Sequence, residues 1–211
     1  MKLSRRTFTL LGLTAMLSPS QALAGDSSNL LRPPGISSEE DFLSKCNRCQ
    51  RCVQVCPTRV VLPASFNHGI IRANTPEITF KRGYCNSCLK CSEVCPTGAL
   101  SPVTENTLDI GIAVIIEPDC VAWDWEGCTV CVDKCPLKAI YLDEYKRPVV
   151  IAERCNGCGV CQFVCPSTSL RTSIKGKGII VEPRPADYGR IFFCYTAESG
   201  YVYPDLKRGG R

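Results

Sequence analysis

The chain has 211 residues and a formal net charge of +5, and 17 of its residues are cysteine whereas only one is histidine. The basic residues form no patch of the kind that nucleic-acid-binding proteins carry, so we expect no nucleic-acid partner. The sequence also lacks a Gly-x-Gly-x-x-Gly turn, a phosphate-binding loop and a nucleophile elbow, and the lone His68 has no catalytic partner set. We therefore expect no catalytic residues, and the cysteines become the main candidates for function.

Residues 1–24 have the features of a twin-arginine signal peptide. Paired arginines in Ser4–Phe8 precede an apolar run over residues 9–17, and Ala22-Leu23-Ala24 offers a small-x-small cleavage site. The apolar run is shorter than the roughly 20 residues that a membrane span needs, although a retained anchor stays open as the alternative. We predict export to the periplasm, where the protein is either soluble or peripheral on the inner membrane.

Sixteen of the cysteines lie in four motifs, at residues 46–57, 85–96, 120–136 and 155–166. Three motifs read C-x2-C-x2-C-x3-C-P, which is the run found in bacterial ferredoxins, and the third motif has seven residues in its first gap. Each motif predicts one [4Fe–4S] cluster, so we expect four clusters. The predicted iron ligands are Cys46, Cys49, Cys52, Cys56, Cys85, Cys88, Cys91, Cys95, Cys120, Cys128, Cys131, Cys135, Cys155, Cys158, Cys161 and Cys165.

Other cysteine chemistries fit this spacing less well. Structural zinc usually takes two separated C-x2-C knuckles, disulfides need partners that three cysteines on one tight loop do not offer, and a thioredoxin-like site needs a single motif. In two-cluster ferredoxins the fourth cysteine of a motif ligates the other cluster, so motifs work in pairs. Sequential pairing (one with two, three with four) and nested pairing (one with four, two with three) are both open, and we favour the nested arrangement.

Short β-rich runs flank the motifs. They follow the motifs at residues 59–62, 99–100, 139–142 and 169–171, and they precede motifs three and four at 112–116 and 149–151. We expect each unit to be a strand, a cysteine loop, a short helix carrying the fourth cysteine, and another strand. The predicted fold class is α+β and ferredoxin-like, with two dicluster units in residues 46–182, a lead-in at 25–45 and a C-terminal tail at 183–211. Because the clusters form much of the core, the apoprotein should be largely unfolded.

The seventeenth cysteine, Cys194, lies in an apolar run within the tail, and we interpret it as a free thiol outside the metal sites. The tail itself is rich in tyrosine and phenylalanine. We interpret it as a strand or two over the cluster domain, with a docking segment as the alternative.

Beyond these patterns, the chain resembles the NapG/MauM family of ferredoxin-type proteins. The resemblance rests on the twin-arginine leader, on Leu31–Gly35 before motif one, on Gly111–Val114 before motif three, and on the stretched third motif that contains Trp123 and Trp125. It implies a periplasmic electron carrier rather than an enzyme. The implied partners are a membrane-bound, NapH-like quinol dehydrogenase and a periplasmic reductase or its cytochrome. Two alternatives stay open, a MauM-like maturation factor and an electron-transfer subunit of a stable oxidoreductase complex.

Overall fold

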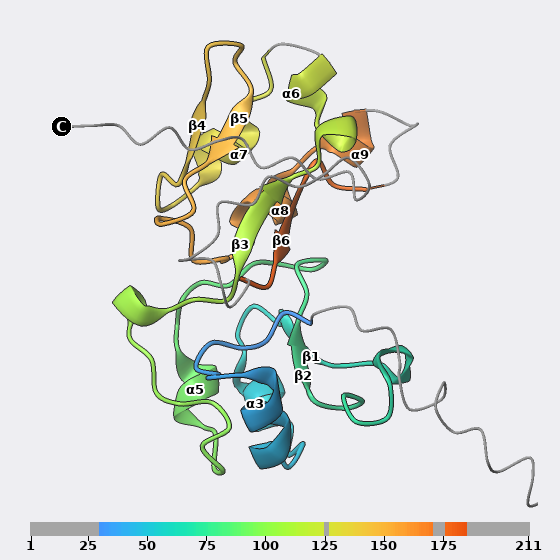
Figure 1. Ribbon diagram of the computed structural model, residues 1–211, viewed down its shortest axis with the longest axis vertical. Helices are drawn as coiled ribbons and strands as arrows, with labels where there is room; N and C mark the ends of the chain where they lie inside the picture. The colour runs from blue at the N-terminus through green and yellow to red at the C-terminus, as the bar shows by residue number, and fades with distance from the viewer. Residues whose placement is uncertain (1–29, 125–126, 171–175, 185–211) are drawn as a thin grey trace, which may run out of the picture.

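The computed structural model describes residues 30–124, 127–170 and 176–184 (Figure 1). The predicted signal peptide, Cys194 and most of the predicted tail lie outside these residues. The described chain combines short helices with short strands, which confirms the predicted mixture of α and β structure. Its α-helices are α3 (Glu39–Lys45), α4 (Arg51–Val55), α5 (Lys90–Glu93), α6 (Val121–Asp124), α7 (Val130–Lys134), α8 (Val160–Val164) and α9 (Ser167–Leu170).

The strands pair into two-stranded antiparallel sheets. The pairs are β1 (Val61–Pro63) with β2 (Pro76–Ile78), β3 (Ile112–Ile115) with β6 (Ile179–Glu182), and β4 (Ile140–Leu142) with β5 (Pro148–Val150). Single 3-10 turns are η1 (Phe66–His68), η2 (Glu105–Thr107) and η3 (Glu117–Asp119). The predicted runs at 59–62, 112–116, 139–142 and 149–151 therefore all contain or overlap a strand, whereas β2 and β6 were not predicted.

Two of these sheets set the distance between consecutive motifs. The β1–β2 pair, in the register Val61 to Ile78, lies between motifs one and two. The β4–β5 pair, in the register Ile140 to Val150, lies between motifs three and four. Each hairpin reverses the chain, so that α4 contacts α5 and α7 contacts α8. The most extensive contacts between elements all stay within residues 30–110, here called the N-terminal half, or within residues 111–184, the C-terminal half (Figure 1).

Two of the predicted strands are wrong. Ala99 and Leu100 are buried, but the Leu100 N–H donates to the Cys95 sulfur at 3.4 Å and is not part of a sheet. Residues 169–170 belong to α9, whose turn is closed by N–H groups of Ser169 and Leu170 bonding to the Pro166 carbonyl. In both places the proline after the fourth cysteine starts a tight turn, and the turn takes the backbone groups that a strand would use.

One continuous hydrophobic core runs through both halves. It includes Phe42 and Phe80 from the N-terminal half, Ile140 and Ile179 from the C-terminal half, and several motif cysteines. Cysteine sulfur thus forms part of the packed interior, as expected for a protein whose metal groups fill the core.

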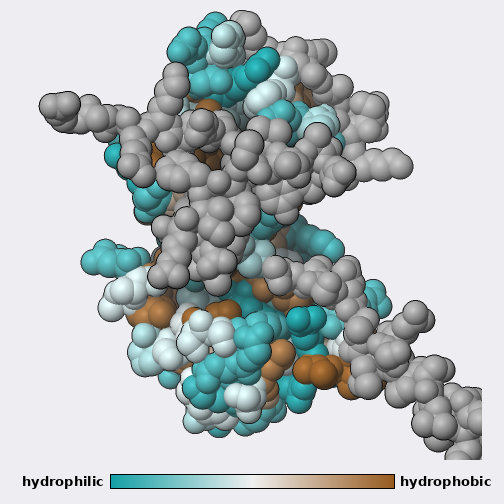
Figure 2. All heavy atoms as spheres, viewed as in Figure 1, coloured by the Kyte–Doolittle hydropathy of each residue, from teal (hydrophilic) through white to brown (hydrophobic). Residues whose placement is uncertain are grey.

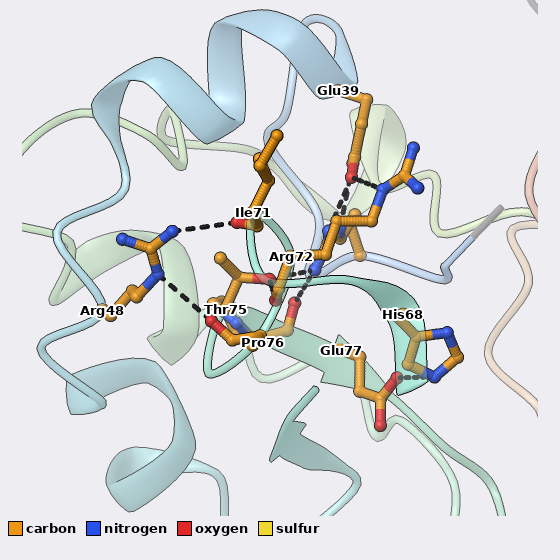
Figure 3. Close-up of polar contacts among 10 residues, drawn as sticks. Glu39, Arg48, His68, Ile71, Arg72, Thr75, Pro76 and Glu77 are labelled. Carbon is orange, nitrogen blue, oxygen red and sulfur yellow. Dashed lines mark hydrogen bonds and ion pairs between the residues drawn. The ribbon is translucent and has the colours of Figure 1, made fainter. Parts of the chain in front are cut away.

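The lead-in is held by a buried arginine. Arg32, which is 3% exposed, donates to both carboxylate oxygens of Glu39 at 2.6 and 2.9 Å, to the Thr75 hydroxyl at 2.8 Å and to the Pro76 carbonyl at 2.8 Å. Its guanidinium also lies 4.9 Å from the centre of the Phe42 ring. Figure 3 shows the partners of this network around Glu39, Thr75 and Pro76. The planar Arg32 guanidinium therefore joins α3 to the start of β2 through four hydrogen bonds and one contact with an aromatic ring.

The pKa of Glu39 reflects this network. Burial alone would raise it, but the hydrogen bonds and charge of Arg32, together with those of Arg72, hold the pKa below its usual value. The carboxylate is therefore ionised at neutral pH and pairs with Arg32.

Replacing Arg32 by alanine should leave the Glu39 carboxylate and the Thr75 and Pro76 oxygens without their donor. We expect the free energy of unfolding to fall by about 3 kcal/mol, the usual cost of removing one partner of a buried ion pair. Anaerobic denaturant unfolding of the cluster-loaded protein measures this change. Lys45→Ala, which removes an exposed pair with Asp41, is the control and should change stability little. An equal effect of both substitutions would contradict the assigned role of Arg32.

Candidate iron-sulfur centres

The three regular motifs share one backbone conformation. The second residue of the first gap and the first residue of the second gap both have positive φ: Arg48 and Gln50 in motif one, Ser87 and Leu89 in motif two, and Gly157 and Gly159 in motif four. Left-handed residues at these two places curl the backbone between the cysteines. The repeated spacing therefore produces a repeated loop.

A short helix follows each loop and carries the third cysteine. Cys52, Cys91, Cys131 and Cys161 lie on α4, α5, α7 and α8. The fourth cysteine was predicted on the helix, and this is wrong. Cys56, Cys135 and Cys165 are the C-cap residues directly after the last residues of α4, α7 and α8, and Cys95 lies two residues after the last residue of α5. The fourth thiol therefore lies beyond the helix, where it can face the cysteine loop of a neighbouring motif.

In the C-terminal half, the cysteines surround two cavities. The four thiols around one cavity come from Cys120, Cys128, Cys131 and Cys165. Those around the other come from Cys135, Cys155, Cys158 and Cys161. Each cavity therefore joins three cysteines of one motif to the fourth cysteine of the other, and apolar side chains fill most of the remaining wall.

The N-terminal half shows the same proximity of one fourth cysteine to the neighbouring motif. Cys56 of motif one lies close enough to Cys85 of motif two for their thiolate charges to interact, and Cys91 is close to both Cys85 and Cys88. Cys52 interacts in the same way with Cys46 and Cys49. Consecutive motifs are therefore neighbours, and the nested pairing that we favoured is wrong. The nested arrangement would have placed motif two against motif three, whereas α4 packs on α5 and α7 packs on α8.

All sixteen motif cysteines are free thiols. Burial, and then the charges of neighbouring thiolates, raises the pKa of Cys120 to about 11 and that of Cys131 to about 12. The same causes raise the pKa of Cys85 to about 11, that of Cys91 to about 12, and that of Cys161. Grouped thiols of this kind hold their protons until a cation replaces them, so metal binding must release protons here.

Backbone N–H groups point at several of the sulfurs. Leu100 donates to Cys95 at 3.4 Å, Ala139 to Cys135 at 3.3 Å, and Ala113 to Cys155 at 3.4 Å. Such bonds stabilise negative charge on sulfur.

Backbone donors of this kind also explain the lowered pKa values of Cys56 and Cys95. Burial alone would raise the pKa of Cys56 and of Cys95, but N–H groups in the turn after each proline, together with a threonine hydroxyl, lower both values.

Hydroxyl groups distinguish motifs one, two and four from motif three. Thr58 lies 3.6 Å from the Cys56 sulfur, Thr97 lies 3.7 Å from the Cys95 sulfur, and Ser167 lies 3.4 Å from the Cys165 sulfur. Each hydroxyl residue stands two positions after its cysteine, in Cys-Pro-Thr or Cys-Pro-Ser. Motif three has Leu137 at this position. The sequence analysis missed these residues, although the repeated tripeptide would have indicated them.

Other candidate groups lie away from the cysteines. His68, in η1, has its Nε2 atom 3.7 Å from a carboxylate oxygen of Glu77 on β2 (Figure 3). Within residues 30–184, apart from the stretches that are not described, no three or more His, Cys, Asp or Glu side chains are close enough to share a single metal ion. The cysteine groups are consistent with this, because each iron of a [4Fe–4S] cluster takes only one protein thiolate. The described helices are all too short or too polar to cross a bilayer.

The comparisons with known proteins agree with this geometry. A family model described as "4Fe-4S dicluster domain" matches residues 45–99 and 126–169. The chain is 34% identical to the methylamine utilization ferredoxin-type protein MauM of Methylobacillus flagellatus over 152 residues, which are 65% of this chain and 64% of that protein. It is 33% identical to the ferredoxin-type protein NapF of Haemophilus influenzae over 66% of this chain and 77% of that protein. It is 34% identical to the ferredoxin-type protein NapG of Escherichia coli over 69% of this chain and 70% of that protein.

The chain belongs to the NapG/MauM family of ferredoxin-type proteins. It is therefore an iron-sulfur protein of the electron-transfer type, and its cofactors are [4Fe–4S] clusters. Four thiols around one cavity fit this group, because each corner iron of a cubane takes a separate thiolate.

The hydroxyl pattern predicts how individual clusters are tuned. A hydrogen bond to a ligand sulfur stabilises the more negative, reduced cluster and raises its reduction potential. Thr58→Val should therefore lower the potential of the cluster bound through Cys56, and Leu137→Thr should raise that of the cluster bound through Cys135. The expected size is about 20 to 60 mV, the one-electron equivalent of one hydrogen bond.

Redox titration followed by electron paramagnetic resonance measures both potentials. Thr58→Ser keeps the hydroxyl and is the matched control, with an expected potential close to that of the wild type. Shifts of the same sign in Thr58→Val and Leu137→Thr would contradict the tuning role.

Proposed function

We propose that this chain is a periplasmic electron carrier that holds four [4Fe–4S] clusters and relays electrons from a membrane-bound quinol dehydrogenase to a periplasmic reductase system. The observation that carries the proposal is the pair of cavities in the C-terminal half, each ringed by three cysteines of one motif and the fourth of its neighbour. Of the two stretches that match the dicluster family model, the first spans motifs one and two, and the second spans motif four and all the cysteines of motif three except Cys120, which supports two such pairs.

The proposed ligand sets follow from the exchange of fourth cysteines. The first set is Cys46, Cys49, Cys52 and Cys95, and the second is Cys85, Cys88, Cys91 and Cys56. The third is Cys120, Cys128, Cys131 and Cys165, and the fourth is Cys155, Cys158, Cys161 and Cys135. We call them sites I to IV, after the motif that supplies three of the ligands.

Bound clusters supply one-electron chemistry, with potentials that the protein sets through hydrogen bonds, charge and exclusion of water. The chain contributes each of these controls. Apolar residues such as Ile115 and Ile179 line the cavity of site III, and Ala113 and Val181 line that of site IV. The N–H groups of Leu100 and Ala139 offset sulfur charge.

Site I lies nearest to solvent and is where we place the exchange of electrons with a partner. Cys49 is the one exposed thiol among the described cysteines, and Cys95 borders an open groove between α4 and α5. Arg48, next to Cys49, donates to the Ile71 carbonyl at 2.8 Å (Figure 3), and the Ile70 and Ile71 side chains are mostly exposed. Figure 2 shows apolar residues on the outer surface of the N-terminal half. Exposed apolar residues of this kind mark contact surfaces.

The location and partners are proposed from the leader and the family. The paired arginines of residues 4–8 support export of a protein that is folded around its clusters before it leaves the cytoplasm. The donor would be a NapH-like quinol dehydrogenase, and the acceptor would be a periplasmic reductase or its cytochrome. Peripheral association with the inner membrane would follow from the first of these contacts.

A second candidate function is the maturation of a periplasmic redox enzyme. It is favoured by the identity to a methylamine utilization protein, which equals the identity to NapG at 34%. A deletion strain separates the two functions. A partner enzyme that is fully assembled but receives no electrons from quinol supports the relay. An enzyme that lacks its finished cofactor supports maturation.

Purified protein tests the relay directly. Four clusters should give about sixteen irons per chain and should take up about four electrons reversibly. Anaerobic iron and sulfide analysis, combined with a reductive titration, measures both quantities. A protein that binds far less iron, or that is not reoxidised after reduction, would overturn the proposal. Recovery of the chain in a stable complex with a catalytic subunit would instead assign it as an electron-transfer subunit.

The ligand exchange predicts the effect of one cysteine substitution. Cys165→Ser should disturb site III, the cluster of motif three, although Cys165 belongs to motif four. We expect one cluster spectrum to be altered or lost while the spectrum of site IV stays intact, as measured by iron analysis and paramagnetic resonance. Cys194→Ser, outside every motif, is the matched control and should keep the wild-type iron content. Loss of the site IV spectrum in Cys165→Ser would show that each motif ligates its own cluster.

A further inference from the structure

The two halves of the molecule touch where two cysteine loops meet. The Cys85 N–H, in the loop of motif two, donates to the Cys158 carbonyl, in the loop of motif four, at 2.8 Å. Among the described residues, this is the one backbone hydrogen bond that joins cysteine loops of different halves. The two residues are also close enough for their thiolate charges to interact. Loops from sites II and IV are therefore in direct contact.

The glycines of motif four are explained by close neighbouring segments and not by backbone conformation. The equivalent positions in motifs one and two have the same positive φ, yet they carry Arg48, Gln50, Ser87 and Leu89. Left-handed backbone at these positions therefore does not require glycine. What differs at Gly159 is the neighbour, because a Cβ atom there would lie 2.2 Å from a ring carbon of Phe80, in the other half.

Gly157 is likewise explained by a neighbour that leaves no room for a Cβ atom. A Cβ atom at this position would lie 2.6 Å from the backbone nitrogen of Gly111, which precedes β3. The neighbouring Asn156 carbonyl accepts a hydrogen bond from the Ile110 N–H at 3.0 Å. The loop of motif four is therefore shaped to receive the segments on either side of it.

Aromatic side chains close the junction. Phe80, 4% exposed, belongs to the continuous core and lies against Gly159. Tyr84, directly before Cys85, packs on Phe163 of α8 with the ring centres 5.9 Å apart. Since Tyr84 and Phe163 belong to different halves, this pair holds the two loops together from the outer side.

We propose that the contact between the Cys85 amide and the Cys158 carbonyl is the crossing point for electrons between the two halves. The order of the sites along the path is then I, II, IV, III, which differs from their order in the sequence. In each crossing, one of the sites II and IV is oxidised by one electron, the other is reduced by one, and no bond or proton changes. The inference rests on the proposed relay function, and it makes Phe80 and Gly159 positioning residues for electron transfer.

The test compares Gly159→Ala with Gly98→Ala in the cluster-loaded protein. Both place alanine at a glycine with left-handed φ, +79° and +69°, but only the first brings a Cβ atom against Phe80, and a Cβ atom at Gly98 has no neighbour within 4 Å. In Gly159→Ala we expect wild-type iron content, loss of the magnetic interaction between the reduced clusters of sites II and IV, and several-fold slower electron equilibration after a flash of photoreductant. Gly98→Ala should match the wild type in all three measurements.

A second variant keeps the test valid if Gly159→Ala binds less iron. Phe80 lies outside every cysteine loop, so Phe80→Ala loosens the junction without altering a ligand loop. It should weaken the same magnetic interaction and slow the same equilibration. The double variant, in which the ring no longer opposes the new Cβ atom, should recover part of the loss seen in Gly159→Ala.

Two outcomes would overturn the crossing point. One is wild-type magnetic coupling and equilibration in an iron-replete Gly159→Ala protein, and the other is the same result in Phe80→Ala. Neither outcome bears on the relay itself, which fails only if the wild-type protein does not bind and reversibly reduce its clusters.

Discussion

The exchange of fourth cysteines between consecutive motifs is the constraint on which the rest of this structure depends. In both cavities of the C-terminal half, three thiols come from one motif and the fourth comes from the end of the neighbouring helix. A bound cluster therefore crosslinks two segments that are separated in sequence. The short elements of the fold serve this crosslink, since the β1–β2 and β4–β5 hairpins return the chain so that α4 meets α5 and α7 meets α8. None of these strands or helices is long enough to be stable alone.

Grouping sixteen thiols in a small core raises an electrostatic problem that the backbone helps to resolve. Burial and neighbouring thiolates both disfavour ionised sulfur, as the raised pKa values of Cys91 and Cys131 show. Iron supplies most of the compensating charge, and N–H groups after the prolines of motifs one, two and three supply a smaller part. This use of backbone donors has a structural consequence. The Leu100 N–H bonds to the Cys95 sulfur and therefore cannot take part in a sheet.

Much of the candidate site was predictable because cysteine spacing is a local property. The four loops, the ligand residues and the strands next to motifs three and four all follow from short-range patterns. The pairing of motifs does not, since it depends on which helices pack together, and our nested prediction was wrong for this reason. Strand β2 is only three residues long and begins with Pro76, so the sequence carries no strand signal there. Arg32 gave no signal either, because its partners lie on α3 and next to β2.

The sequence by itself determined the cofactor type and the family to which the chain belongs, and cysteine spacing alone named the candidate ligands. Thiolate chemistry is local, and three cysteines within seven residues leave iron-sulfur clusters as the best fit. Only the tertiary structure decided which motifs share a site and where the two halves meet. Those properties depend on contacts between distant segments, such as Cys85 with Cys158 and Gly159 with Phe80. The sequence alone does not explain why position 159 is glycine. The structure does, because the Phe80 ring leaves no room there for a Cβ atom.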